Sequence, residues 1–156
     1  MPRLEDLSDT ARQGHLNFPA MEHDDAPFAP LRKPLSETKL ALVTTAGLHL
    51  RGDAPFASGD QTYRVIPSDS PASAIIQSHT SIGFDRTAIM RDINVTFPID
   101  RLRELVERGT IGELSERFYS FMGAHRDPKR IVEETGPEVA RKLLDEGVEA
   151  VLLTPT

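Results

Sequence analysis

The sequence predicts an α/β protein with a mainly parallel sheet and flanking helices, and two apolar stretches carry most of that prediction. Thr38–Ala46 is short, apolar and rich in β-branched residues, and Gly47 follows it, which is typical of a buried central strand. Val148–Leu153 has the same character and comes directly after a helical pattern that ends at Gly147. Because a helix, a glycine and an apolar strand form a recurring α/β unit, we expect the two stretches to be parallel neighbours in one sheet.

Shorter elements are expected between these two strands. Tyr63–Ile66 and Ala74–Ser78 have the composition of short strands, and the turn-forming residues of Leu48–Thr62 predict a loop. Residues 79–96 show no clear period, although a short strand could form at Asp92–Thr96. The sheet should therefore contain more than its two long strands.

The last third of the chain predicts two helices. The first is Asp100–Arg108, with Gly109 at its end, and its apolar residues share one face: Leu102, Leu105 and Val106. After it, Ile111–Ser115 is expected to add a turn, and Phe118–Phe121 is expected to be a short strand or a packed loop.

The second helix has a clear start and an interruption. It begins at Asp127–Pro128, where the aspartate can cap the helix, and either restarts or kinks at Gly136–Pro137. Thr135 and Glu138 have the spacing of a capping box. One face is expected to be buried: Val139, Ala140, Leu143 and Leu144.

The N-terminal segment differs from the rest in composition. Residues 1–37 hold five of the twelve prolines, which disfavour both helices and central strands. We expect a proline-rich arm at 1–37, with a short helix at Leu4–Gln13 and an extended Ala20–Ser36, followed by an α/β domain at 38–156. The arm could be a mobile or surface-hugging tail, or it could wrap a partner subunit through its apolar residues Phe18, Phe28 and Leu31.

Charge and composition argue against several classes of protein. With 18 basic and 24 acidic residues the formal net charge is −6, and no basic stripe is present, so nucleic acid is a poor partner. No run of about 18 apolar residues predicts a membrane span, and the first residues lack the apolar core of a secretion signal. We therefore expect a cytoplasmic protein without a membrane or nucleic-acid partner. The chain contains no cysteine, so it has neither disulfides nor thiolate nucleophiles.

Four polar residues are candidates for a site. His49 and His79 each follow a predicted strand, where open α/β sheets place their ligands, and His79 could shuttle a proton. Asp92 and Asn94 precede a helix start and could bind the ammonium or carboxylate of a small amino acid, or could satisfy backbone groups of a turn. The spacing of the histidines predicts no metal site.

Four stretches in order resemble one family of proteins. They are ALVTTAGLHLRGDAPF (41–56), TYRVIPSD (62–69), RDINVTFPIDRLRELVERGTIG (91–112) with RFYSFMGA (117–124), and IVEETGPEVARKLLDEGVEAVLLTPT (131–156). They resemble the selenoprotein subunit of D-proline reductase and the related protein B components of the glycine, sarcosine and betaine reductases. The resemblance covers residues 38–156 and leaves the proline-rich arm uncovered.

The resemblance implies a reaction and a catalytic position. Family members reductively cleave a C–N bond of a small amino acid, with a pyruvoyl group on a partner subunit holding the substrate amine. Their catalytic selenocysteine or cysteine follows a Thr-Pro-x turn, which corresponds to the position directly after Thr156, so Thr154 and Thr156 are expected to lie at the substrate site. The resemblance further implies that this chain is the front part of a longer protein cut at an in-frame UGA codon, with its sheet incomplete at the C-terminal end. As it stands, the chain is expected to be inactive.

Two other interpretations of the sequence stay open at this stage. The chain could be a short, non-catalytic α/β module that binds a partner subunit or a small molecule. It could also be related to cofactor-free racemases, α/β enzymes that place a cysteine after a sheet strand.

Overall fold

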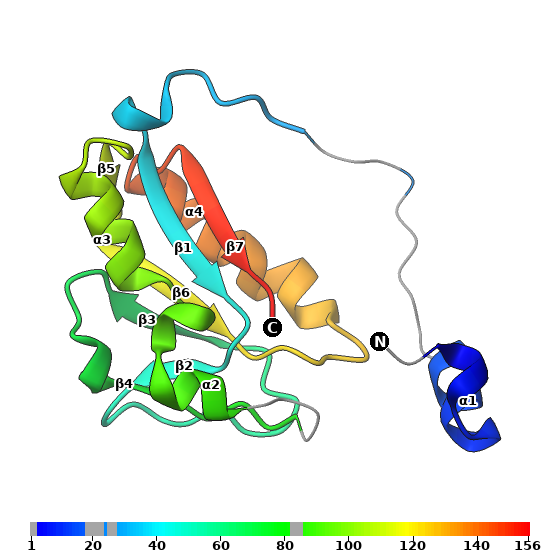
Figure 1. Ribbon diagram of the computed structural model, residues 1–156. Coiled ribbons are helices and arrows are strands. Elements are labelled where there is room, and N and C mark those ends of the chain that lie inside the picture. Colours follow the sequence, from blue (N-terminus) through cyan, green and yellow to red (C-terminus); the bar gives the residue numbers. More distant parts are fainter. Residues whose placement is uncertain (1–2, 18–23, 25–27, 82–85) are drawn as a thin grey trace. The chain divides into compact units, whose positions relative to one another are not determined.

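The computed structural model describes residues 3–17, 24, 28–81 and 86–156. By its internal contacts the chain divides into two compact units, Met1–Pro30 and Leu31–Thr156. Figure 1 shows both units, coloured along the sequence. Phe18 and part of the predicted extended segment Ala20–Ser36 lie outside the described residues.

The first unit contains the predicted short helix, with different bounds. A single turn, η1 (Leu4–Asp6), precedes α1 (Asp9–Leu16), and the hydroxyl of Ser8 accepts a hydrogen bond from the Ala11 N–H. The helix therefore begins after Ser8 rather than at Leu4, because serine is a preferred N-terminal cap. None of the residues of η1 or α1 is buried.

The main sheet of the second unit is built around β1 (Lys39–Thr44). Along one edge of β1, Leu40–Thr44 pairs in parallel with β7 (Ala150–Thr154), which confirms the predicted neighbours. Along its other edge, β1 pairs in parallel with β5 (Glu113–Leu114) and then with β6 (Arg117–Phe121). Because β1 has a partner on both edges, three of its residues are almost completely buried: Ala41, Leu42 and Thr44.

Two predictions on this sheet need correction. Ile111–Ser115 was expected to form a turn, but it contains β5, because its backbone follows the edge of β1. The stretch Val148–Leu153 was expected to be a buried strand, yet the side chains of Val151 and Leu153 are 41% and 67% exposed. Among the described residues β7 pairs only with β1, so it lies at an edge of the sheet.

The middle of the chain adds antiparallel pairs. The strand β3 (Tyr63–Pro67) pairs antiparallel with β6 and completes the main sheet among the described residues. A separate two-stranded sheet joins β2 (Leu48–Leu50) to β4 (Ile75–Gln77), with the single turn η3 (Ala72–Ala74) before it. The prediction of a loop throughout Leu48–Thr62 is therefore wrong at its start, where three residues pair with β4.

Helices replace the irregular segment predicted before residue 97. Arg86–Arg91 forms α2, and the turn η4 (Ile93–Val95) occupies the place of the strand suggested at Asp92–Thr96. A strand is prevented there because the Asp92 carboxylate accepts the Asn94 N–H and caps the turn. Another single turn, η2 (Leu35–Glu37), precedes β1.

Two longer helices cover opposite faces of the main sheet (Figure 1). The helix α3 (Ile99–Glu107) lies on the face where Phe97 packs edge-on against Phe118, with ring centroids 5.9 Å apart. The helix α4 (Gly136–Asp145) lies on the other face, where Glu138 accepts a 2.6 Å hydrogen bond from the Tyr63 hydroxyl. Neighbouring residues of β6 point to opposite faces, so one strand contributes to both halves of the core.

The helical segment before α4 contains a π-helical turn, η5 (Ile131–Thr135). Asp127 caps its start as predicted by accepting the Lys129 N–H. The helix therefore continues through Gly136–Pro137 without a break. The π-helical turn accommodates Pro137, which lacks an N–H, and Gly136 fits there because a Cβ would lie 2.5 Å from the Ile131 carbonyl oxygen.

Two predictions on this helix are wrong. The capping box does not form, because the Thr135 hydroxyl donates to the Gln61 carbonyl oxygen while Glu138 binds Tyr63. On the face predicted to be buried, Val139 and Leu143 are buried, whereas Ala140 and Leu144 are exposed. The buried stripe is narrow because α4 packs on the sheet along a single i, i+4 row.

Candidate functional site

The carboxyl ends of β1, β6 and β7 meet at one edge of the main sheet, because these strands are parallel. Hydrogen bonds tie two of these ends together. The Thr45 N–H donates to the Thr154 carbonyl oxygen at 3.3 Å, and the Thr156 N–H donates to the Thr45 hydroxyl at 2.8 Å. The chain leaving β7 is thereby held against the end of β1.

His79 reaches this edge from another direction. It follows β4, its side chain is 1% exposed, and it packs against the backbone of Gly47, just beyond β1. A Cβ on Gly47 would lie 3.0 Å from Cα and 3.2 Å from Cβ of His79. Gly47 also has φ of +65°, a conformation that favours glycine. This position therefore needs a residue without a side chain for His79 to lie where it does.

Gly123, just beyond β6, opens the space between His79 and Thr156. A Cβ on Gly123 would lie 2.6 Å from the Thr156 carbonyl oxygen and 3.2 Å from Nε2 of His79. It would also lie 3.2 Å from the Thr45 carbonyl oxygen. The imidazole and the backbone of Thr156 thus border the same small space, which only a glycine leaves open.

The surroundings of His79 define its protonation. Burial lowers its pKa below the ordinary 6.5, and the positive charges of Arg86 and His125 lower it further. The Ser81 N–H donates to Nδ1 at 3.2 Å, so Nδ1 is the acceptor and the neutral ring carries its proton on Nε2. At neutral pH the ring therefore presents an N–H on the side of Gly123.

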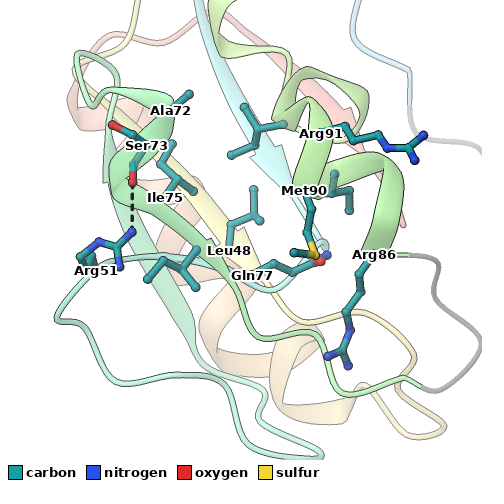
Figure 2. A pocket seen from close by; sticks show the side chains of 12 residues that line it. Leu48, Arg51, Ala72, Ser73, Ile75, Gln77, Arg86, Met90 and Arg91 are labelled. Carbon is teal, nitrogen blue, oxygen red and sulfur yellow. Dashed lines mark hydrogen bonds between the residues drawn. The ribbon is translucent and has the colours of Figure 1, made fainter.

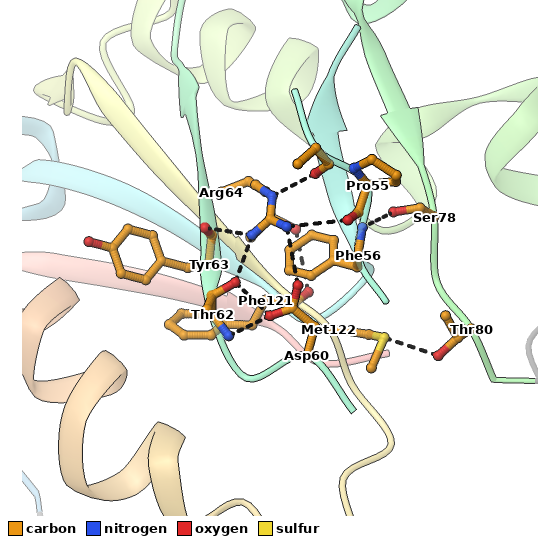
Figure 3. A network of polar contacts seen from close by, with 12 residues as sticks. Pro55, Phe56, Asp60, Thr62, Tyr63, Arg64, Ser78, Thr80, Phe121 and Met122 are labelled. Carbon is orange, nitrogen blue, oxygen red and sulfur yellow. Dashed lines mark hydrogen bonds and ion pairs between the residues drawn. The ribbon is translucent and has the colours of Figure 1, made fainter. Parts of the chain in front are cut away.

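A network centred on Arg64 shapes the loop beside His79 (Figure 3). The guanidinium of Arg64 donates to the carbonyl oxygens of Ala54 and Pro55, pairs with the Asp60 carboxylate at 3.2 Å and lies 4.3 Å from the ring centroid of Phe56. Burial acts to raise the pKa of Asp60, but hydrogen bonds from Thr62 and Arg64 outweigh it and lower that pKa. This arginine therefore holds several turns of the loop in one conformation.

The same loop and the residue that follows β6 hold both neighbours of His79 in the chain. The Phe56 N–H donates to the Ser78 hydroxyl at 2.8 Å, and the Thr80 hydroxyl contacts Sδ of Met122 at 3.1 Å (Figure 3). Because Ser78 and Thr80 are both anchored, the backbone of His79 is fixed from each side. The orientation of the imidazole follows from this support.

The structure brings together three of the residues predicted for the site, His79, Thr154 and Thr156. Oγ1 of Thr154 is buried and has no hydrogen-bond partner among the described residues. Sequence reasoning did not select three others that shape this edge: Thr45, Gly47 and Gly123. A signal was present, since each glycine comes shortly after an apolar strand, a pattern that often marks close approach of two backbones.

The other predicted residues lie elsewhere. His49 is 5% exposed in the β2–β4 sheet, and its Nδ1 donates to the Leu50 carbonyl oxygen at 2.9 Å. Asp92 and Asn94 lie in the turn before α3, where the Asn94 amide bonds both Asp92 and Asp100. These contacts use both residues within the turn, which is the second of the two roles considered from the sequence.

The described ranges contain neither a cluster of metal ligands nor a helix suited to span a membrane. No group of three or more histidine, aspartate or glutamate side chains there is arranged to hold a metal ion. None of the helices formed by those residues is long and apolar enough to cross a lipid bilayer.

The fold and this edge define an α/β protein in which a buried histidine that follows β4 lies beside the carboxyl ends of the parallel strands β1 and β7. Comparison with known families identifies which protein of this kind it is: the chain belongs to the glycine/sarcosine/betaine reductase selenoprotein B family, whose model matches residues 4–156. The match extends beyond residues 38–156 and includes most of the proline-rich segment.

Curated relatives carry consistent names. The chain is 44% identical over 128 residues to the D-proline reductase subunit gamma of Acetoanaerobium sticklandii, covering 81% of this chain and 52% of the relative. It is 32% identical over 143 residues to the sarcosine reductase complex component B subunit beta of Peptoclostridium acidaminophilum, covering 89% of this chain and 33% of the relative. The betaine reductase complex component B subunit beta of the same organism is 31% identical over 98% of this chain and 35% of the relative.

The chain matches only a part of each of these relatives. It spans about half of the D-proline reductase subunit and about a third of the other two relatives. The relatives are named as subunits of reductases or of reductase complexes. No solved structure is significantly similar to this chain.

Proposed function

We propose that the chain takes part in the reductive cleavage of the C–N bond of a small amino acid, as a subunit of a reductase complex. The 44% identity to a D-proline reductase subunit supports D-proline as the first substrate to test. With D-proline the bond between Cα and nitrogen would break and the ring would open to 5-aminopentanoate. The reaction consumes two electrons and two protons, which a dithiol would supply by becoming a disulfide.

The single observation that supports a role for this part of the fold is the position of His79 beside Thr156. A selenocysteine or cysteine directly after Thr156 would supply the nucleophile for this chemistry, and a pyruvoyl group on a partner subunit would hold the substrate amine. The residues present fit such a position: the Thr45 hydroxyl anchors Thr156, and Gly123 leaves the adjacent space open.

His79 would then hold a proton next to the reacting atoms. Its neutral ring carries the proton on Nε2, the atom that borders the space opened by Gly123. The neutral ring can first take up a proton as a general base, and the imidazolium that forms can then donate one to the amine that leaves carbon as a general acid. Ser78 and Thr80 would keep the ring in place during this exchange.

The test uses the intact reductase complex, isolated from cells through an affinity tag on this chain. The complex is incubated with a dithiol and D-proline, glycine, sarcosine or betaine, and the cleaved products are quantified. We expect 5-aminopentanoate from D-proline. Reduction of none of the four substrates would overturn the proposed function, and recovery of the chain with a stable partner subunit would then favour the non-catalytic module.

A variant separates the role of His79 from the reaction itself. His79→Gln should lower kcat by roughly 10²–10⁴-fold with little change in KM and should flatten the pH profile of kcat. His15→Gln is the matched control, because His15 is exposed in α1 of the other unit. An active complex whose kcat and pH profile are unaffected by His79→Gln would refute the role of His79 and leave the reductase function standing.

A further inference from the structure

A cavity of about 600 Å³ lies between the β2–β4 sheet and α2 (Figure 2). Its apolar lining includes buried Leu48 and Ile75 from the two strands and buried Ile89 from α2. A cavity of this size and lining is typical of sites for small organic molecules. It lies within the second unit, and nothing in the proposed reductase chemistry uses it.

One polar atom in this lining lacks a partner. Oε1 of Gln77 is buried and accepts no hydrogen bond from any of the described residues. The orientation of the amide is fixed, because Nε2 of Gln77 donates to the Ala46 carbonyl oxygen at 3.0 Å. A buried acceptor without a donor costs free energy, so Gln77 presents an unmet requirement for an O–H or N–H group.

Positive charge borders the same cavity. Arg51 and Arg86 line it, and neither forms an ion pair with a carboxylate of the described residues. Each guanidinium instead donates to a backbone carbonyl oxygen, Arg51 to Ser73 and Arg86 to His79, and carries a charge that no carboxylate of the described residues neutralises. These two guanidinium groups are therefore suited to bind an anion.

The view in Figure 2 separates these arginines from a third one. Arg51 lies beside the strands and Arg86 extends from α2, whereas the side chain of Arg91 is directed away from Gln77. Arg86 and Arg91 both belong to α2, but Arg86 also connects this cavity to the backbone of His79, because its guanidinium donates to the His79 carbonyl oxygen.

We propose that this cavity binds a small organic anion that has an apolar body and carries a hydroxyl or N–H group. Its carboxylate would pair with Arg86, its apolar body would contact Ile75 and Ile89, and its donor would satisfy Oε1 of Gln77. A purely apolar ligand would leave the arginines and Gln77 unpaired, and inorganic phosphate would leave the apolar lining uncovered.

The test compares three probes that differ by one group at a time: 2-hydroxyhexanoate, hexanoate and hexanol. Each is titrated into the full chain labelled with ¹⁵N, and amide shifts of the β2, β4 and α2 residues report binding. We expect 2-hydroxyhexanoate to bind most tightly, hexanoate several-fold more weakly and hexanol most weakly. Absence of shifts at these residues, or equal affinity for the three probes, would overturn the proposal.

Variants of the chain measure how much Arg86 and Gln77 contribute to binding. Arg86→Gln should weaken 2-hydroxyhexanoate on the order of tenfold, whereas Arg101→Gln should not, because Arg101 is an exposed residue of α3 outside the cavity. Gln77→Leu should remove the preference for the hydroxylated acid over hexanoate. If Gln77→Leu fails to fold, the probe series and Arg86→Gln still decide, and an Arg86→Gln variant that binds as tightly as the parent chain would refute the site.

Discussion

Replacing Gly47 by alanine tests whether the close packing of Gly47 on His79 stabilises the fold. The alanine Cβ would lie 3.0–3.2 Å from three atoms of His79, two of them in the backbone. Gly59 provides a matched control: its φ of +74° is close to the +65° of Gly47, but a Cβ there would meet nothing within 4 Å. The two substitutions therefore share the backbone strain and differ in the steric contact.

The expected magnitudes follow from these two terms. An alanine in the left-handed region costs about 1–2 kcal/mol, which is the whole effect expected for Gly59→Ala. Gly47→Ala adds overpacking against an anchored backbone, about 1–3 kcal/mol more. Urea unfolding gives both free energies, and the imidazole resonances of His79 should move only in Gly47→Ala. Equal destabilisation by the two substitutions would refute the argument that Gly47 positions His79.

Two predictions concern titration. The two tyrosines should not ionise near the ordinary pH 10. Burial and the hydrogen bond to Glu138 raise the pKa of Tyr63 to about 12, and burial with the charge of Glu146 raises the pKa of Tyr119. Tyrosinate absorbance during an alkaline titration measures this, and a full transition at pH 10 in the folded protein would contradict it. For His79 burial, with nearby positive charges, lowers the pKa below 6.5, so its contribution to stability is complete above pH 6.5 and is lost as the pH falls through the lowered pKa. Urea unfolding at a series of pH values should show this loss in the parent chain and a smaller one in His79→Gln, and identical profiles would contradict the assignment.

The centre of the sheet could be predicted because its signal is local. The apolar runs at β1 and β7 identify strands, the helix between them implies a parallel connection, and no distant contact has to be known. The residues of β2 and β5 carry no such signal. Leu48–Leu50 has a polar residue at its centre and three turn-forming residues soon after it, so its pairing with β4 depends on tertiary packing rather than on propensity.

The errors on β7 and α4 have one physical cause. Both were predicted to bury apolar residues that are in fact exposed, because a sequence pattern records which residues are apolar and not which face a neighbour covers. Val151, Leu153 and Leu144 are all exposed, at 41%, 67% and 71%. Val151 and Leu153 lie on β7, which is at an edge of the sheet among the described residues, whereas Leu144 lies on α4 beside the buried row of Val139 and Leu143. Both positions depend on how the other elements pack.

The candidate site could be predicted in part for the same reason. His79 was selected because it follows a strand, and Thr154 and Thr156 because of the family resemblance, yet neither argument indicates that they meet. That follows from the register: with Thr44 opposite Thr154, the next residues of both strands leave the sheet together, and Thr45 binds Thr156. The approach of His79 additionally requires glycines at the ends of β1 and β6, since any side chain at either position would occupy its space. The two glycines are thus the sequence features that, read with the register, identify this edge as the place where His79 and the end of β7 come together.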